Sequence, residues 1–76
     1  MTTIHASDIR PGDVVETIPS IASGRTTATR ITVDAVKPYR VNGDVFYDVH
    51  GIETPNGGGT TVTNMSNEYR LVAMFH

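Results

Sequence analysis

The sequence predicts a single all-β domain of five strands, and three observations support this. The β-branched residues Thr, Val and Ile are abundant and favour strands, whereas leucine, a strong helix former, occurs only at Leu71. Gly and Pro recur between the apolar segments, as turn residues do. Asn42-Gly43 lies between two apolar runs, and this dipeptide is the strongest short-range signal for a two-residue hairpin. With 76 residues, the chain has the length of one small domain, residues 1–76.

The first strand is predicted over residues 14–18, directly after a turn. Pro11 has a fixed φ and Gly12 tolerates a positive one, so this pair is typical of a β-turn. We expect Ile9, just before the turn, to be buried beneath the sheet. Pro19 ends the strand because proline has no N–H to donate to a neighbouring strand.

The longest strand is predicted over residues 27–37, where Ile31, Val33 and Ala35 alternate with polar residues. This period of two indicates one buried face, on which Ala35 follows Val33. The strand continues past Pro38 to the Asn-Gly turn, and residues 45–52 form the return strand.

A two-residue turn determines which side chains face one another across this hairpin. It places Lys37 opposite Asp48 as an ion pair and Tyr39 opposite Phe46 as an aromatic pair, both of which are favourable. Either Phe46 or Tyr47 can fill the core from this hairpin; because Phe46 shares a face with Ala35, the register favours Phe46 as the one that points toward the core. Tyr47 points the other way.

The C-terminal part is predicted as a flexible connection, a short strand, one turn and a closing strand. The connection, residues 54–59, is rich in glycine, and the short strand covers residues 60–64. Residues 65–68 are too few for an α-helix and suit one 3₁₀ turn. Residues 69–75 alternate in character and form the last strand.

This order of elements resembles the SH3-like small barrel, with one 3₁₀ turn before the last strand. The segment DIRPGDVV, residues 8–15, is similar to the lead-in to the first strand in SH3-like domains of transcription and translation proteins. Residues 12–15, 24–25 and 31–33 loosely resemble a KOW motif, which implies nucleic-acid binding. The motif's usual glycine at the start of the second strand is replaced here by residues 26–29, TTAT. The composition is also similar to that of small actinobacteriophage accessory proteins.

The residues that could carry catalysis or bind a metal form no recognisable pattern. The histidines, His5, His50 and His76, have no metal-site spacing, although Asp48 and His50 share a strand face and can form a pair. Residues 57–59 are three glycines, but a strand rather than a helix follows them, unlike a phosphate-binding loop. We therefore expect no enzymatic activity, no metal and no cofactor.

The candidate binding surface combines aromatic area with positive charge near the hairpin tip. Such a mixture can stack on bases or anchor a protein partner. An alternative for Arg40 is a salt bridge to Asp44 or Asp48 within the hairpin. The candidate residues are Tyr39, Arg40 and Tyr47, with Arg25 and Arg30 as an extension.

The charge balance favours a protein partner over nucleic acid. The formal net charge is −2, whereas non-specific nucleic-acid binding depends on a basic surface. The chain has no cysteine, no apolar run long enough to span a membrane and no signal-peptide pattern, so we expect a cytoplasmic protein. The sequence thus predicts a non-enzymatic module that binds itself or a host protein. The alternatives are a KOW-like nucleic-acid-binding domain and a minor virion or structural component.

Overall fold

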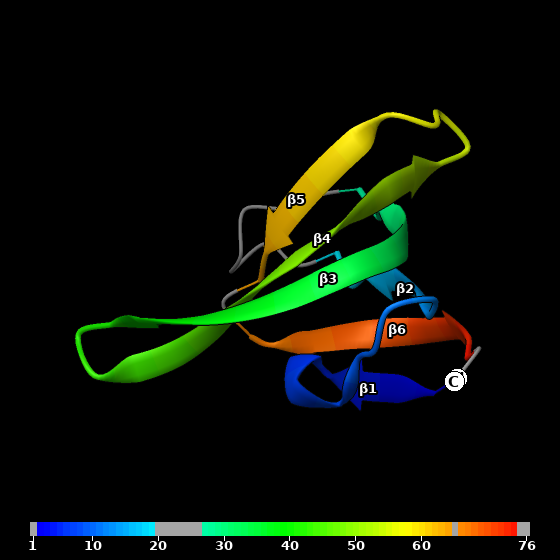
Figure 1. Ribbon diagram of the computed structural model, residues 1–76. Coiled ribbons are helices and arrows are strands. Elements are labelled where there is room, and N and C mark those ends of the chain that lie inside the picture. The colour runs from blue at the N-terminus through cyan, green and yellow to red at the C-terminus, as the bar shows by residue number, and fades with distance from the viewer. Residues whose placement is uncertain (1, 20–26, 65, 75–76) are drawn as a thin grey trace.

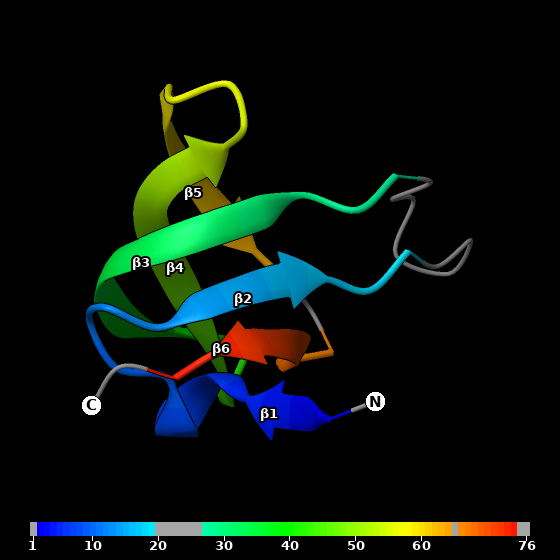
Figure 2. The same ribbon diagram turned by 90° about the vertical axis from the view of Figure 1, so that its right-hand side faces the viewer.

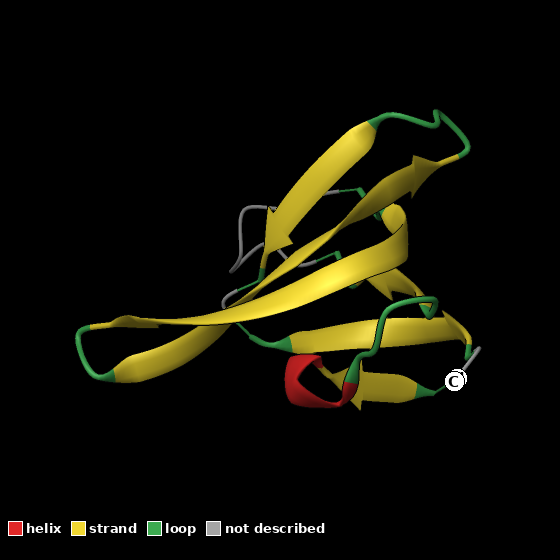
Figure 3. Ribbon diagram, in the orientation of Figure 1, coloured by secondary structure: helices red, strands yellow, loops and turns green. Residues whose placement is uncertain are grey.

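The structure is a computed structural model that describes residues 2–19, 27–64 and 66–74. The prediction of an all-β protein is confirmed, since strands and one 3₁₀ turn make up the regular structure of these residues (Figure 3). In chain order (Figure 1) the elements are β1 (Thr3–His5), η1 (Ala6–Asp8), β2 (Val14–Thr17), β3 (Arg30–Val41), β4 (Asp44–Thr54), β5 (Gly59–Thr63) and β6 (Glu68–Ala73).

The strands form one antiparallel sheet in the order β1-β6-β2-β3-β4-β5. The predicted closed barrel of five strands is therefore wrong in two respects. A sixth strand, β1, pairs with β6, and the edge strands β1 and β5 are not paired with each other in the described part of the chain. Three residues carry too little periodicity to predict a strand. β1 exists because β6, far away in the sequence, offers it a partner.

The 3₁₀ turn also lies elsewhere than predicted. It was expected at residues 65–68, but Met65 is outside the described residues, Ser66 lies in a turn and Glu68 already belongs to β6. Asn67 adopts a φ of 56° in this turn, which an asparagine tolerates better than most residues. The observed 3₁₀ turn, η1, is capped by the His5 side chain, whose Nδ1 accepts a hydrogen bond from the backbone N–H of Ser7 at 3.1 Å.

The Pro-Gly turn before β2 forms as predicted. Gly12 has a φ of 97°, and the backbone N–H of Asp13 donates to the carbonyl of Arg10 at 3.1 Å, closing a four-residue turn. The N–H of Gly12 donates to the carbonyl of Val33 on β3 at 2.8 Å, so the turn is attached to the sheet. Ile9 is 2% exposed, which confirms its predicted burial.

The central hairpin has the predicted register, with Lys37 opposite Asp48 and Tyr39 opposite Phe46. Asn42 and Gly43 form its turn, both with positive φ, as a type I′ turn requires. The expected ion pair is absent from those formed by the described residues, and the Asp48 carboxylate accepts a hydrogen bond from the Thr63 hydroxyl.

The sheet curls around a core to which every strand contributes (Figure 2). The Tyr69 hydroxyl on β6 donates to the carbonyl of Val62 on β5 at 3.5 Å, although β5 and β6 are not neighbours in the sheet. Such contacts require the sheet to fold back on itself. The buried apolar residues are Ile4, Ala6, Ile9, Val15, Ile31, Val33, Val49, Val62 and Tyr69.

Candidate interaction surface

The β3–β4 hairpin is the longest feature of the molecule and projects beyond the other strands (Figure 1). Alternate side chains of a strand point to opposite faces of the sheet. On β4, Tyr47 and Val49 point to the inner face, where Val49 is part of the core. Phe46 and Asp48 therefore lie on the outer face. The two faces of the hairpin carry different chemistry.

The outer face carries an aromatic pair near the hairpin tip. The ring centroids of Tyr39 and Phe46 are 6.1 Å apart at an angle of 48°, within the range of favourable aromatic contacts. Both residues are half-buried, and neither belongs to the core or packs against it. Val41, two residues beyond Tyr39 on the same face, is 41% exposed. These three side chains, Tyr39, Val41 and Phe46, form the outer hairpin surface.

The expectation that Phe46 points to the core is wrong, and a bulge in β3 explains why. The pairing register shifts between Val33 and Ala35, so Asp34 is an extra residue on β3. The extra residue reverses the alternation of faces. Val36, rather than Ala35, continues the inner face of Val33, and Val36 packs against the core. Because Phe46 shares a face with Ala35, it lies outside.

Tyr47 is the aromatic residue of the hairpin that contacts the core. It packs against the core cluster, and its ring meets the His5 ring edge-on, with centroids 6.1 Å apart and planes at 83°. This contact joins the N-terminal segment to the hairpin. Tyr47 therefore has a structural role on the inner face. It lies on the opposite face of the hairpin from Tyr39, the other aromatic candidate of the predicted binding surface.

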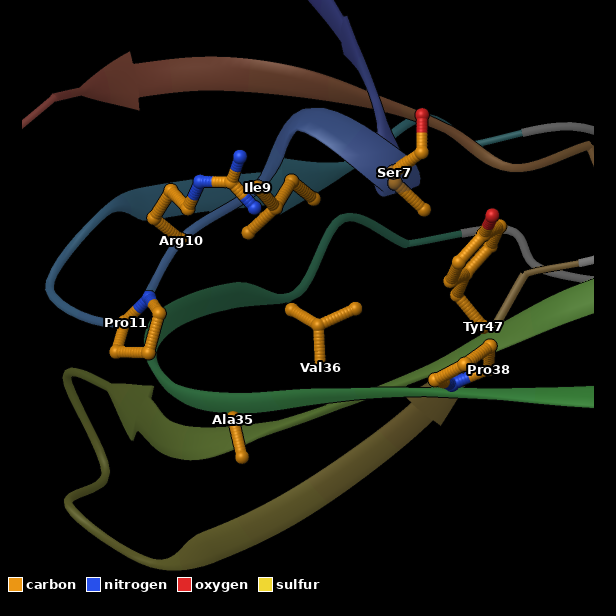
Figure 4. A pocket seen from close by; sticks show the side chains of 9 residues that line it. Ser7, Ile9, Arg10, Pro11, Ala35, Val36, Pro38 and Tyr47 are labelled. Atoms are coloured by element: carbon orange, nitrogen blue, oxygen red, sulfur yellow. The ribbon is translucent and has the colours of Figure 1, made fainter.

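A pocket of about 300 Å³ lies between the N-terminal segment and the inner face of the hairpin. Figure 4 shows Val36 pointing into it and Ala35 pointing away, in agreement with the bulge. Its walls are mostly apolar, and Arg10 is the charged residue among those that line it. The lining residues are Ala6, Ser7, Ile9, Arg10, Pro11, Ala35, Val36, Pro38 and Tyr47. This size suits one apolar side chain or a small ligand.

The two predicted arginines that the structure describes, Arg30 and Arg40, lie at opposite ends of β3. Arg40 is exposed near the hairpin tip, on the face opposite Tyr39, and is not among the residues that form ion pairs in the described part of the chain. Arg30 lies at the other end of β3, where its guanidinium pairs with Glu16 at 3.3 Å. Arg25 falls outside the described residues. Of the four candidates that the structure describes, only Tyr39 belongs to the outer hairpin surface.

Polar side chains on the outer face of β4 bond to β5 rather than to each other. His50 Nδ1 lies 2.9 Å from the Thr61 hydroxyl, and the Asp48 carboxylate accepts from the Thr63 hydroxyl. The Asp48 carboxylate and the His50 imidazole thus each have a threonine of β5 as hydrogen-bond partner. The Asp48–His50 pair that the sequence suggested is not formed. These hydrogen bonds orient the threonine side chains of β5, and Asp48 and His50 do not form an acid/base couple.

Sequence reasoning missed Val41 as a surface residue, and it favoured the core for Phe46, which was part of the aromatic and basic cluster at the hairpin tip. Alternation of side chains along a strand predicts that Val41 shares a face with Tyr39, so the sequence contained the signal for Val41. The sequence contained no signal for the outward position of Phe46, because nothing in the local sequence marks the bulge at Asp34.

Comparison with protein-family models, curated proteins and solved structures finds no match to this chain. Within residues 2–19, 27–64 and 66–74, no group of three or more His, Cys, Asp or Glu side chains is placed to hold a metal ion. None of the helical segments in these residues is long and apolar enough to cross a membrane.

Proposed function

We propose that this chain is a non-enzymatic protein-binding module that contacts its partner, a host protein or another copy, through the outer hairpin surface. The observation that carries the proposal is the solvent-facing aromatic pair of Tyr39 and Phe46, which packs on itself and not on the core. Aromatic side chains supply large contact areas and dominate the energetics of protein interfaces. A hairpin that projects from the sheet presents them to a partner.

The charges around the pair favour protein over nucleic acid as the partner. On the outer face, Lys37 is accompanied by Asp44 and Asp48. Aromatic rings on a sheet face can stack on bases, which is the observation in favour of the KOW-like alternative. Phosphates, however, need an excess of positive charge, and two carboxylates beside one ammonium do not provide it.

We also propose an SH3-like fold extended by one strand. Support comes from the order β6-β2-β3-β4-β5, in which four consecutive strands pair in sequence and the last strand pairs with the first of them. β1 is then an addition at the edge of β6. In this proposal the module acts in the cytoplasm.

The test compares a hairpin variant with a control variant at a different exposed apolar site. In the double variant Tyr39→Ser/Phe46→Ser, we expect the domain to stay folded. The amount of partner that is crosslinked to it in a host lysate should fall at least about tenfold. Val72→Ser is the control, because Val72 is 40% exposed on β6, away from the hairpin. Unchanged capture by the double variant, or a wild type that is crosslinked neither to a lysate protein nor to a second copy of itself, would contradict the proposal.

A titration of salt separates the nucleic-acid alternative. Each phosphate neutralised by the protein makes affinity fall more steeply with salt. We expect no binding of single- or double-stranded oligonucleotides at about 50 mM salt, measured by fluorescence anisotropy. Tight binding that weakens steeply with added salt would favour the KOW-like function instead.

A further inference from the structure

Among the described residues, the outer edge of β5 is an open strand edge without the usual protection. β5, with the sequence GTTVT, has five residues and contains no charged residue and no proline, and its pairing with β4 runs without a bulge. The other edge strand, β1, has only three residues. Natural proteins protect exposed edges with short strands, charges, prolines or bulges, because a long bare edge pairs with other chains. In the described part of the chain, no strand covers the outer edge of β5.

The hydrogen bonds to β4 determine which backbone groups of β5 are unpaired. The N–H of Glu53 donates to the carbonyl of Gly58 at 2.8 Å, just before β5 begins. In an antiparallel pair, hydrogen-bonded positions alternate with non-bonded ones. The even-numbered residues of β5 therefore bond to β4. The odd-numbered residues Gly59, Thr61 and Thr63 direct their N–H and C=O groups outward.

We propose that β5 pairs with β5 of a second copy, antiparallel, around a two-fold axis that passes beside Thr61. Thr61 then faces Thr61 of the partner subunit as a hydrogen-bonded pair, and Gly59 faces Thr63 of the partner subunit. This register uses all three outward-facing residues of each copy and makes about six backbone hydrogen bonds. The same patch meets itself, as a closed two-fold dimer requires.

The side chains next to the edge fit this pairing. The Thr61 and Thr63 hydroxyls are held toward β4 by His50 and Asp48, so they do not obstruct the edge. Ile52 is 47% exposed and lies beside Gly59, where a Cβ would meet no atom within 4 Å. In the proposed register, Thr63 of the partner subunit lies next to Gly59 and covers this exposed isoleucine. The pairing thus accounts for an apolar side chain that the single chain leaves in water.

The edge contact is separate from the outer hairpin surface. It involves backbone groups of β5, whereas Tyr39 and Phe46 lie near the tip of the hairpin. A short strand pair buries less surface than a standard protein interface, so we expect a weak dimer that forms with increasing concentration. Loss of partner capture in the hairpin variant and loss of the dimer are therefore distinguishable results.

Disulfide trapping tests the register directly, because the chain has no cysteine of its own. In the variant Thr61→Cys, the two thiols of the dimer sit on Cα atoms about 5.5 Å apart, within disulfide range. In the control variant Thr63→Cys, the two cysteines are offset along the strands by roughly 14 Å and cannot join. We expect Thr61→Cys to form covalent dimers under mild oxidation at least about tenfold faster than Thr63→Cys. Circular dichroism checks that both variants are folded.

Sedimentation velocity of the cysteine-free chain provides the second measurement. We expect the sedimentation coefficient to rise from about 10 µM to about 1 mM protein. Thr61→Lys should abolish this rise, since it places two like charges face to face across the axis. Equal trapping rates for the two cysteine variants, a concentration-independent monomer, or a Thr61→Lys variant that still dimerises would each overturn the proposal.

Discussion

The carboxylate of Asp13 closes the turn that begins at Arg10: its Oδ2 accepts a hydrogen bond from the Arg10 backbone N–H at 3.0 Å. Asp13 is fully buried, and the turn that it closes also bonds to β3 through the N–H of Gly12. The aspartate of the DIRPGD segment is therefore a structural residue that holds the N-terminal segment against the sheet.

We expect Asp13→Ala to destabilise the domain by about 1–3 kcal/mol, because the Arg10 N–H loses its acceptor in a partly buried place. Urea unfolding followed by circular dichroism measures this. Asp8→Ala is the matched control, since Asp8 is exposed and its loss should change stability by no more than about 0.5 kcal/mol. Equal effects of the two variants would refute the role assigned to Asp13.

Gly51 on β4 has no room for a side chain. A Cβ at this position would overlap the backbone oxygen of Thr32 and come within 2.6 Å of Ile31 Cγ2. We expect Gly51→Ala to cost about 1–3 kcal/mol or to prevent folding, because the backbone must move to relieve the overlap. Gly58→Ala is the control, since a Cβ there meets nothing within 4 Å. A Gly51→Ala variant as stable as Gly58→Ala would show that β3 and β4 pair less closely.

Glu16 joins three strands through two ion pairs. Its carboxylate contacts Arg70 on β6 at 2.7 Å and Arg30 on β3 at 3.3 Å. Both arginines are substantially exposed, so solvent weakens these pairs and we expect Glu16→Gln to cost only about 1 kcal/mol. The cost should shrink as salt is added, because salt screens exposed charges. Unfolding curves at low and high salt test this, with Glu53→Gln as control; a salt-independent cost would argue against the ion pairs.

The two neighbouring aromatic residues of β4 should differ in their contribution to stability. Tyr47 packs against the core and against His5, so we expect Tyr47→Ala to cost about 2–4 kcal/mol. Phe46 contacts Tyr39 outside the core, and Phe46→Ala should cost about 1 kcal/mol. Thermal unfolding of both variants compares them directly. The reverse order would mean that the faces of the hairpin are assigned the wrong way round.

Local sequence by itself determined two of the turns and the register of the central hairpin. Pro11-Gly12 and Asn42-Gly43 adopt the conformations that their residue types favour, and the two-residue turn at Asn42 correctly aligned Tyr39 with Phe46. These features depend on a few adjacent residues, whose backbone preferences act without help from the rest of the chain.

Only the tertiary structure decided which side of the hairpin faces the core, where the extra strand β1 lies and which edge stays open. The bulge at Asp34 reverses the alternation of faces. Tyr47, and not Phe46 as predicted, therefore packs against the core, and Phe46 lies on the outer hairpin surface. β1 became a strand because β6 lies beside it, and β5 became an open edge because no described strand follows it in the sheet. A period-two pattern specifies alternation within a strand, whereas bulges and partners are selected by packing between segments distant in the sequence.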